Sequence, residues 1–126
     1  MMEIIKDLPD DTVGIISRGK ITAKEYEAVI IPAFEEKFKT HDKLNALFVM
    51  EDYEGVELAA LWDDACFGIK HWSGFKRLAL VTDMDWAKSA AAFVAWMIPA
   101  EVRVFTMSEI DQARNWVAGL PLEDAA

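Results

Sequence analysis

The chain has 126 residues, of which 53% are hydrophobic, and it carries 13 Lys and Arg against 22 Asp and Glu, a formal net charge of −9. This length is that of one domain, residues 1–126, and the apolar fraction excludes a disordered chain. The acidic balance and the lack of a basic cluster exclude nucleic acid and anionic membrane surfaces as partners, and they favour a basic partner.

The sequence shows no segment that directs a chain into a membrane. The first ten residues lack the basic start and apolar run of a secretion signal. The longest apolar stretches, such as Ala90 to Ala100, are too short to span a bilayer. Cys66 is the only cysteine, so no intrachain disulfide can form. We therefore expect a cytoplasmic location and no membrane insertion.

Two short strands, Met2–Lys6 and Thr12–Ser17, are the first predicted elements. The residues between them, 7–11, are Asp, Leu, Pro, Asp and Asp. Proline fixes φ and an Asp side chain can bond nearby backbone, so this composition is typical of a turn. We predict an N-terminal β-hairpin that Gly19 closes.

A long amphipathic helix is predicted next, from Thr22 to about His41. Thr22 and Glu25 have the spacing of a capping box, in which a hydroxyl and a carboxylate satisfy free backbone N–H groups at a helix start. Pro32 removes one helical hydrogen bond. Because the apolar stripe keeps its phase on both sides of Pro32, we predict a kink there and not a break. The stripe consists of Tyr26, Ile30, Phe34 and Phe38.

The middle of the chain alternates strand and helix. Leu44–Met50 is a nearly continuous apolar run, which is typical of a strand covered on both faces. Residues 51–55 form a polar connector to a second amphipathic helix, from about Val56 to Trp72. Arg77–Thr82 is then another buried strand.

The last part of the chain repeats this order. Asp83 or Asp85 can cap a third helix, and Glu101–Thr106 has the polar alternation of a strand near an edge. Ser108 is expected to cap the final helix and Gly119 to end it, with residues 119–126 frayed. The stripe of the third helix consists of Trp86, Ala90, Phe93, Val94 and Met97.

Strand and helix therefore alternate from Thr12 onward. Strands that are joined through a helix generally run parallel, with the helices packed on the faces of the sheet. The pattern predicts an α/β fold: a mostly parallel sheet with about four flanking helices, preceded by the hairpin.

Several local patterns resemble one known family. They are Gly19–Tyr26 leading to Ile31-Pro32, Leu61–Asp64 with Phe67 and His71, Phe75–Asp83 followed by Trp86, Val104-Phe105, and Ala113–Trp116. Together they resemble the SpoIIAA-like branch of the STAS superfamily, whose reference member is the bacterial anti-sigma factor antagonist. The resemblance covers nearly the whole chain and implies a mixed sheet of four to five strands with helices packed against it, a fold that usually serves as a non-enzymatic regulatory module.

The resemblance also bears on regulation and ligand. Classical antagonists carry a phosphorylatable serine at the start of the helix that follows the third strand. The matching segment here, Glu51–Gly55, has no Ser or Thr, which argues against a phosphorylation switch at that point. The fold is similar to that of CRAL-TRIO lipid-binding domains, which keeps a small apolar ligand open by analogy.

Residues with catalytic or metal-binding chemistry form no convincing set. Cys66 and His71 do not stack on one helix face, as a nucleophile pair would require without help from another element. Asp63, Asp64 and His71 could supply metal ligands, but Asp64 and His71 lie two helical turns apart, too far for one ion without help from another element. The six glycines are scattered and form no phosphate-binding loop. We expect neither a metal nor a cofactor.

The aromatic residues provide the candidate ligand site. Trp62, Trp86 and Trp96 can wall an apolar cleft if their helices lie on adjacent parts of the sheet, with Asp52, Tyr53 and Asp83 at its mouth. Aromatic rings more often fill a core, so that alternative stays open. A second apolar concentration, with Phe93, Met97 and Ile98 as its interface residues, indicates a dimer or partner surface if it is exposed.

Three hypotheses about function follow. The first is a binding or regulatory module that acts through a protein partner or a small lipid-like ligand. The second is a hydrolase or transferase with carboxylates assembled in space from Asp52, Asp64 and Asp83, for which raised pKa values in a deep cleft would be the sign. The third is a structural homodimer that forms through Met97 and Ile98.

Overall fold

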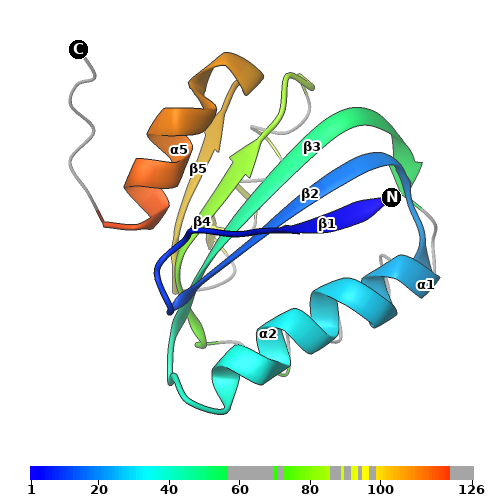
Figure 1. Ribbon diagram of the computed structural model, residues 1–126. Helices are drawn as coiled ribbons and strands as arrows, with labels where there is room; N and C mark the ends of the chain where they lie inside the picture. Colours follow the sequence, from blue (N-terminus) through cyan, green and yellow to red (C-terminus); the bar gives the residue numbers. More distant parts are fainter. Residues whose placement is uncertain are drawn as a thin grey trace.

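A five-stranded sheet forms the centre of the structure, in which the strands lie side by side in chain order (Figure 1). The computed structural model describes residues 1–56, 70, 73–85, 89, 92, 93, 95, 96 and 99–119, without the side chains of 52–56. The first strand pairs antiparallel with the second, and all other neighbours are parallel, which confirms the predicted hairpin and the mostly parallel sheet. The strands are β1 Met2–Ile5, β2 Thr12–Ile21, β3 Leu44–Val56, β4 Phe75–Val81 and β5 Glu101–Phe105.

The strands β3 and β4 are neighbours in the interior of the sheet, as their apolar runs predict. Their ladder pairs Ala46 with Leu78 and Val49 with Val81. Leu47, Val49 and Val81 are completely or almost completely buried. The last strand, β5, pairs only with β4 and forms the far edge, which agrees with the polar alternation in its sequence.

The polar segment 51–55 is part of β3, so its prediction as a connector is wrong. The strand β2 continues past Gly19 to Ile21, and this extra length gives the backbone of β3 a partner: Lys20 pairs with Gly55 and Ile21 with Val56. Gly19 does not end its strand, because it lies within β2 at a φ of 73°, where the register of the ladder shifts. Glycine adopts this left-handed conformation without steric cost.

The crossover from β2 to β3 is one helical run of three parts, α1 Ala23–Glu25, η1 Tyr26–Ile30 and α2 Ile31–Phe38. The Thr22 hydroxyl accepts from the Glu25 N–H at 3.2 Å, which confirms the predicted cap. The segment η1 is a π-helix that ends at Ile30, two residues before Pro32, where a kink is predicted. The Ile31 N–H donates to the Tyr26 carbonyl, five residues earlier in the chain, so the helix has one wider turn just before the proline.

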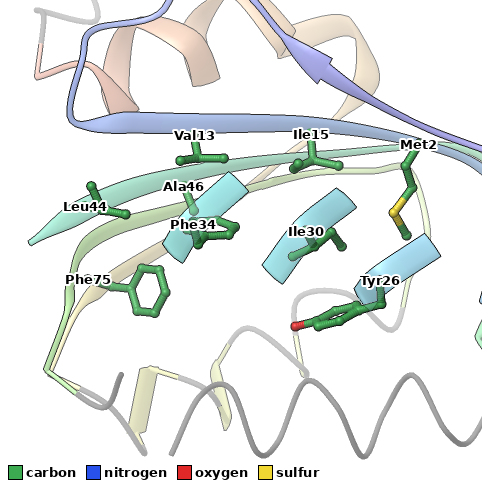
Figure 2. Packing of buried hydrophobic residues seen from close by; sticks show 9 residues of the cluster. All are labelled: Met2, Val13, Ile15, Tyr26, Ile30, Phe34, Leu44, Ala46 and Phe75. Carbon is green, nitrogen blue, oxygen red and sulfur yellow. The ribbon is translucent and has the colours of Figure 1, made fainter. Parts of the chain in front are cut away.

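This helical run covers one face of the sheet. Apolar side chains from β2, β3 and β4 point toward the helix, and Phe34 stands between them (Figure 2). The ring of Phe34 stacks on Phe48 at 6.2 Å and meets Phe75 edge-on at 5.6 Å between centroids. The buried members of this first core cluster are Met2, Val13, Ile15, Tyr26, Ile30, Phe34, Leu44, Ala46 and Phe75.

The other face of the sheet is covered by α5 Ile110–Val117, which follows the short 3-10 helix η2 Met107–Glu109 (Figure 1). The cap of this helical segment is Thr106 and not Ser108: the Glu109 carboxylate accepts from the Thr106 N–H at 2.9 Å, the geometry of a capping box. Gly119, at φ 81°, follows the last turn as predicted. The second core cluster consists of Leu47, Val49, Ala79, Val81, Phe105, Ala113, Trp116 and Val117.

Two predicted helices fall mainly outside the described residues. Of the helix expected from Val56 to Trp72, two residues are described: Val56 is the last residue of β3, and Lys70 is helical. Of the helix expected after Asp85, residues 89, 92, 93, 95 and 96 are described, and all are helical. Residues 120–126 also lie outside the described part.

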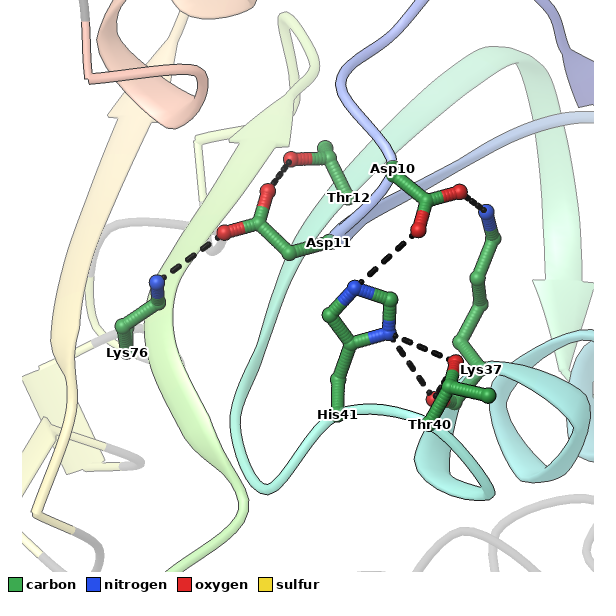
Figure 3. Close-up of polar contacts among 7 residues, drawn as sticks. All are labelled: Asp10, Asp11, Thr12, Lys37, Thr40, His41 and Lys76. Carbon is green, nitrogen blue, oxygen red and sulfur yellow. Dashed lines mark hydrogen bonds and ion pairs between the residues drawn. The ribbon is translucent and has the colours of Figure 1, made fainter.

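The turn between β1 and β2 is held by ion pairs on both sides (Figure 3). The two carboxylate oxygens of Asp10 lie 3.0 Å from Lys37 Nζ and 3.1 Å from His41 Nε2, which ties the turn to the end of α2. Lys76 donates to Asp11 at 3.0 Å, which ties the same turn to β4. The hydrogen bond and the positive charge of Lys76 hold the pKa of Asp11 below its ordinary value of 3.8.

The lowered pKa of Asp11 predicts how stability depends on pH. A carboxyl group whose pKa is lower in the folded state contributes stability while it is ionised, fully above 3.8, and loses it as the pH falls below that value. The free energy of unfolding should therefore fall less steeply in acid for Asp11→Asn than for the unsubstituted chain. For a partly exposed ion pair the difference is below about 1 kcal/mol.

Urea unfolding at neutral pH and near pH 3 measures this difference. Asp42→Asn is the matched control, because Asp42 is exposed and forms no ion pair with the described residues. An acid response of Asp11→Asn as steep as that of the control would contradict the role of Lys76.

Candidate functional site

The carboxyl ends of β4 and β5 open into a cavity of about 510 Å³. In open α/β sheets, ligands gather beyond the carboxyl ends of the strands. Both polar and apolar side chains line this cavity: carboxylates and hydroxyls stand beside methionine, valine and phenylalanine. Its lining residues are Thr82, Asp83, Met84, Asp85, Val104, Phe105, Thr106 and Glu109.

Asp83 is the one predicted site residue whose side chain the structure places at this cavity. Its carboxylate accepts from the Met107 N–H at 3.0 Å. Met107 is the first residue of η2, so Asp83 satisfies a free N–H at the start of the last helical segment and links the end of β4 to the end of β5. Thr82, which is buried, accepts from the Met84 N–H at 3.2 Å and fixes the chain on the other side of Asp83.

The backbone of Asp52 and Tyr53 lies at the same end of the sheet as Asp83. The β3–β4 ladder ends where Val49 pairs with Val81, and both Asp52 and Asp83 follow within a few residues of that pair. The side chains of Asp52 and Tyr53 lie outside the described part, as do Trp62 and Trp86. The cleft with these residues around it therefore stays a prediction.

Trp96 and Phe93 form an exposed aromatic pair on the helical segment between β4 and β5. The side chain of Trp96 is 83% exposed and that of Phe93 is 52% exposed. Their rings stack, with centroids 6.2 Å apart and planes inclined by 18°. Residues three apart share one side of a helix, so the two rings present one continuous surface. We call Phe93 and Trp96 the aromatic face.

Trp96 belongs to the predicted cleft, whose other aromatic residues lie outside the described part. The lining residues of the cavities of about 420, 510 and 640 Å³ do not include Trp96. The predicted interface also contains Met97 and Ile98, but both lie outside the described residues.

Comparison with known proteins decides the family. The SpoIIAA-like family model matches residues 12–118, which include four of the five strands and both described helical runs. The chain belongs to the SpoIIAA-like family. A crystal structure of an uncharacterized DUF3478-family protein with a SpoIIAA-like fold, from Shewanella loihica PV-4, is similar with a TM-score of 0.76. The two are 26% identical, and the match covers 93% of this chain and 92% of the other. No curated protein matches.

Membership of the SpoIIAA-like family gives the class of function. Domains of this fold are in general regulatory or binding modules, they generally lack enzymatic activity, and they often bind proteins. No helix in the described part of this SpoIIAA-like chain is long and apolar enough to cross a membrane.

The alternative of an enzyme with assembled carboxylates gains no support from the described residues. Asp83 already accepts a backbone hydrogen bond. Asp64 and the side chain of Asp52 lie outside the described part, as do Asp63, Cys66 and His71. Among the side chains that are described, no three His, Cys, Asp or Glu gather as metal ligands.

Proposed function

We propose that this SpoIIAA-like domain is a regulatory module that binds a protein partner through the aromatic face formed by Phe93 and Trp96. The observation that supports this proposal is the 83% exposure of Trp96. Leaving the large apolar surface of a tryptophan in water is costly. Tryptophan is also enriched among the few interface residues that contribute most of the binding energy.

The arrangement of the two rings suits them to recognition. Because Phe93 stacks on Trp96, each ring limits the motion of the other before a partner arrives. Less side-chain entropy is then lost on binding. The flanking positions Ala92 and Ala95 are exposed and small, so a partner can approach the rings closely.

The partner that this chain favours is a basic protein. The formal net charge of −9 creates a negative field, which attracts a cationic surface and repels a second copy of the same chain. We therefore propose a partner with an apolar recess that receives the two rings and a basic rim around it. Association with such a partner should weaken as salt is added, whereas association of two acidic copies should strengthen.

Photocrosslinking in cells that express the chain tests this proposal. A photoreactive amino acid at Ala92 lies one helical turn from Trp96 and leaves Trp96 in place. We expect one predominant adduct, formed with a basic protein, that disappears when Trp96→Ala is added to the same chain.

The matched control carries the same photoreactive group at Glu36, which is exposed on α2, the helix between β2 and β3. This position should not give that adduct. If the adduct forms equally from both positions, or survives Trp96→Ala, the aromatic face is not the contact surface. An adduct between two copies of the chain would replace the basic partner by a homodimer.

A further inference from the structure

The strand β5 forms an open edge of the sheet (Figure 1). It pairs with β4 on one side, and no described strand lies on its other side. The strand, Glu101–Phe105, contains no proline, and its register with β4 runs without a bulge. Proline and bulges are two of the devices that keep a further strand from pairing with an edge. Neither device is present in β5, so its backbone can accept a further strand.

The backbone of β5 offers hydrogen-bonding groups to such a strand. The Phe105 carbonyl accepts from the Thr82 N–H at 2.9 Å, so it points toward β4. Successive residues of a strand direct their backbone groups to opposite sides, and alternate residues direct them to the same side. The N–H and carbonyl groups of Val102 and Val104 therefore point to the open edge.

Two side chains of opposite charge lie on one face of this strand. Residues two apart in a strand share a face, so Glu101 and Arg103 are neighbours on the face that carries Phe105. Both are exposed, and neither forms an ion pair with a described residue. Charge on an edge discourages pairing with a like-charged strand, but it attracts a strand that carries the complementary signs. This edge therefore selects for charge.

The guanidinium of Arg103 is held in place before a partner arrives. Its carbon Cζ lies 5.5 Å from the centroid of the Phe105 ring and 5.7 Å from that of Trp116. Both rings are buried, and Trp116 belongs to α5, so these contacts keep the guanidinium on the face of the sheet that α5 covers. Less side-chain entropy is then lost when a carboxylate of a partner binds to Arg103.

We propose that β5 binds an extended segment of a protein partner, which adds to the sheet as an antiparallel strand. An acidic residue of this segment lies opposite Arg103, and a basic residue two positions later lies opposite Glu101. The apolar residue between them packs beside Val102 on the other face. Antiparallel pairing is slightly more stable per residue than parallel pairing, which favours this direction. The recognised sequence therefore reads acidic, apolar, basic from its N-terminus.

A second copy of the chain is the less favoured occupant of this edge. The segment Glu101–Arg103 itself reads acidic, apolar, basic, so two copies could pair around Val102. The formal net charge of −9 on each copy opposes such a pair. A short segment of a partner, with its own charges balanced, meets no such repulsion.

NMR titration of the chain with two synthetic peptides, both capped at their ends, tests the proposal. The first peptide is Val-Glu-Val-Lys-Val, and the second, Val-Lys-Val-Glu-Val, has the same composition with the charges exchanged. We expect the first peptide to shift the backbone amide resonances of Val102 and Val104 and to bind at least about fivefold more tightly than the second. Exchanging the charges of the strand, with Glu101→Arg and Arg103→Glu together, should reverse this preference.

The control variant exchanges the charges of another exposed ion pair, with Glu36→Lys and Lys39→Glu together. It keeps the net charge, as the exchange in β5 does, and should keep the preference for the first peptide. The comparison of the two peptides on the unsubstituted chain needs no variant, so it decides the matter even if a variant fails to fold.

Three results would overturn the proposal. The first is no shift of Val102 and Val104 with either peptide. The second is equal affinity for the two peptides, or tighter binding of the second one. The third is a shift of both valines that grows with protein concentration in the absence of peptide, which would place a second copy at this edge. The strand contains neither Phe93 nor Trp96, so the outcome is independent of the function proposed for the aromatic face.

Discussion

Replacing Phe34 by alanine is expected to lower the free energy of unfolding by about 3–5 kcal/mol. The ring is 2% exposed and contacts Phe48 of β3 and Phe75 of β4. Its removal leaves a cavity between α2 and the sheet that the rigid strands cannot fill. Because a domain of this size has a total stability of about 5–15 kcal/mol, this loss is a large share of it.

Urea unfolding followed by far-UV circular dichroism measures this loss. Phe93→Ala is the matched control, since the chemical change is the same and the side chain is 52% exposed. We expect the control to change the free energy of unfolding by less than about 1 kcal/mol. Equal losses for the two variants would show that Phe34 is not in a packed core.

Trp96→Ala is expected to leave the fold intact and to weaken partner binding by about 30-fold or more. Trp96 is 83% exposed and its ring stacks on the partly exposed Phe93, so its removal takes little from the core. In a complex, however, the same ring would be buried at the centre of the interface. Calorimetric titration of the purified partner identified by crosslinking measures the change in affinity.

The matched control for this prediction is Ile4→Ala. Ile4 is a large apolar residue of β1 with 46% of its surface exposed, and it lies outside the aromatic face. Its substitution should leave the affinity for the partner unchanged. If Trp96→Ala binds as tightly as Ile4→Ala, the aromatic face does not carry the binding energy.

Much of the fold can be predicted from local patterns. The continuous apolar runs that became β3 and β4 identify interior strands, because only strands covered on both faces are apolar at successive positions. The Thr22–Glu25 spacing marks the start of the first helix, and the turn composition of residues 7–11 marks the hairpin. Each of these signals depends on neighbours in the sequence, and each is confirmed.

The features that the sequence does not reveal depend on partners far away in the chain. The polar residues 51–55 become strand because β2 extends beyond Gly19 and offers backbone hydrogen bonds. Thr106 caps the last helical segment although Ser108 has equal propensity, because the Glu109 carboxylate returns to the Thr106 N–H. Composition alone therefore predicts strands poorly, because the available pairing partners decide whether a segment becomes a strand.

The same limit applies to the candidate sites. The helical spacing of Phe93 and Trp96 shows that they share a side of the helix, but only tertiary packing decides whether that side meets the sheet or the solvent. Asn45 is the one polar residue in the apolar run Leu44–Met50, and it is buried with its neighbours. A polar side chain at an interior strand position needs a hydrogen-bond partner, and the sequence alone does not say which residue supplies it.

Sedimentation velocity of the chain alone and with its basic partner, at low and at high salt, tests the protein-binding function most directly. We expect the chain alone to be monomeric and the two proteins to form a one-to-one complex, which weakens as salt is added and is lost in Trp96→Ala. A chain that sediments as a dimer on its own, and becomes a monomer when Trp96 is replaced, would contradict it.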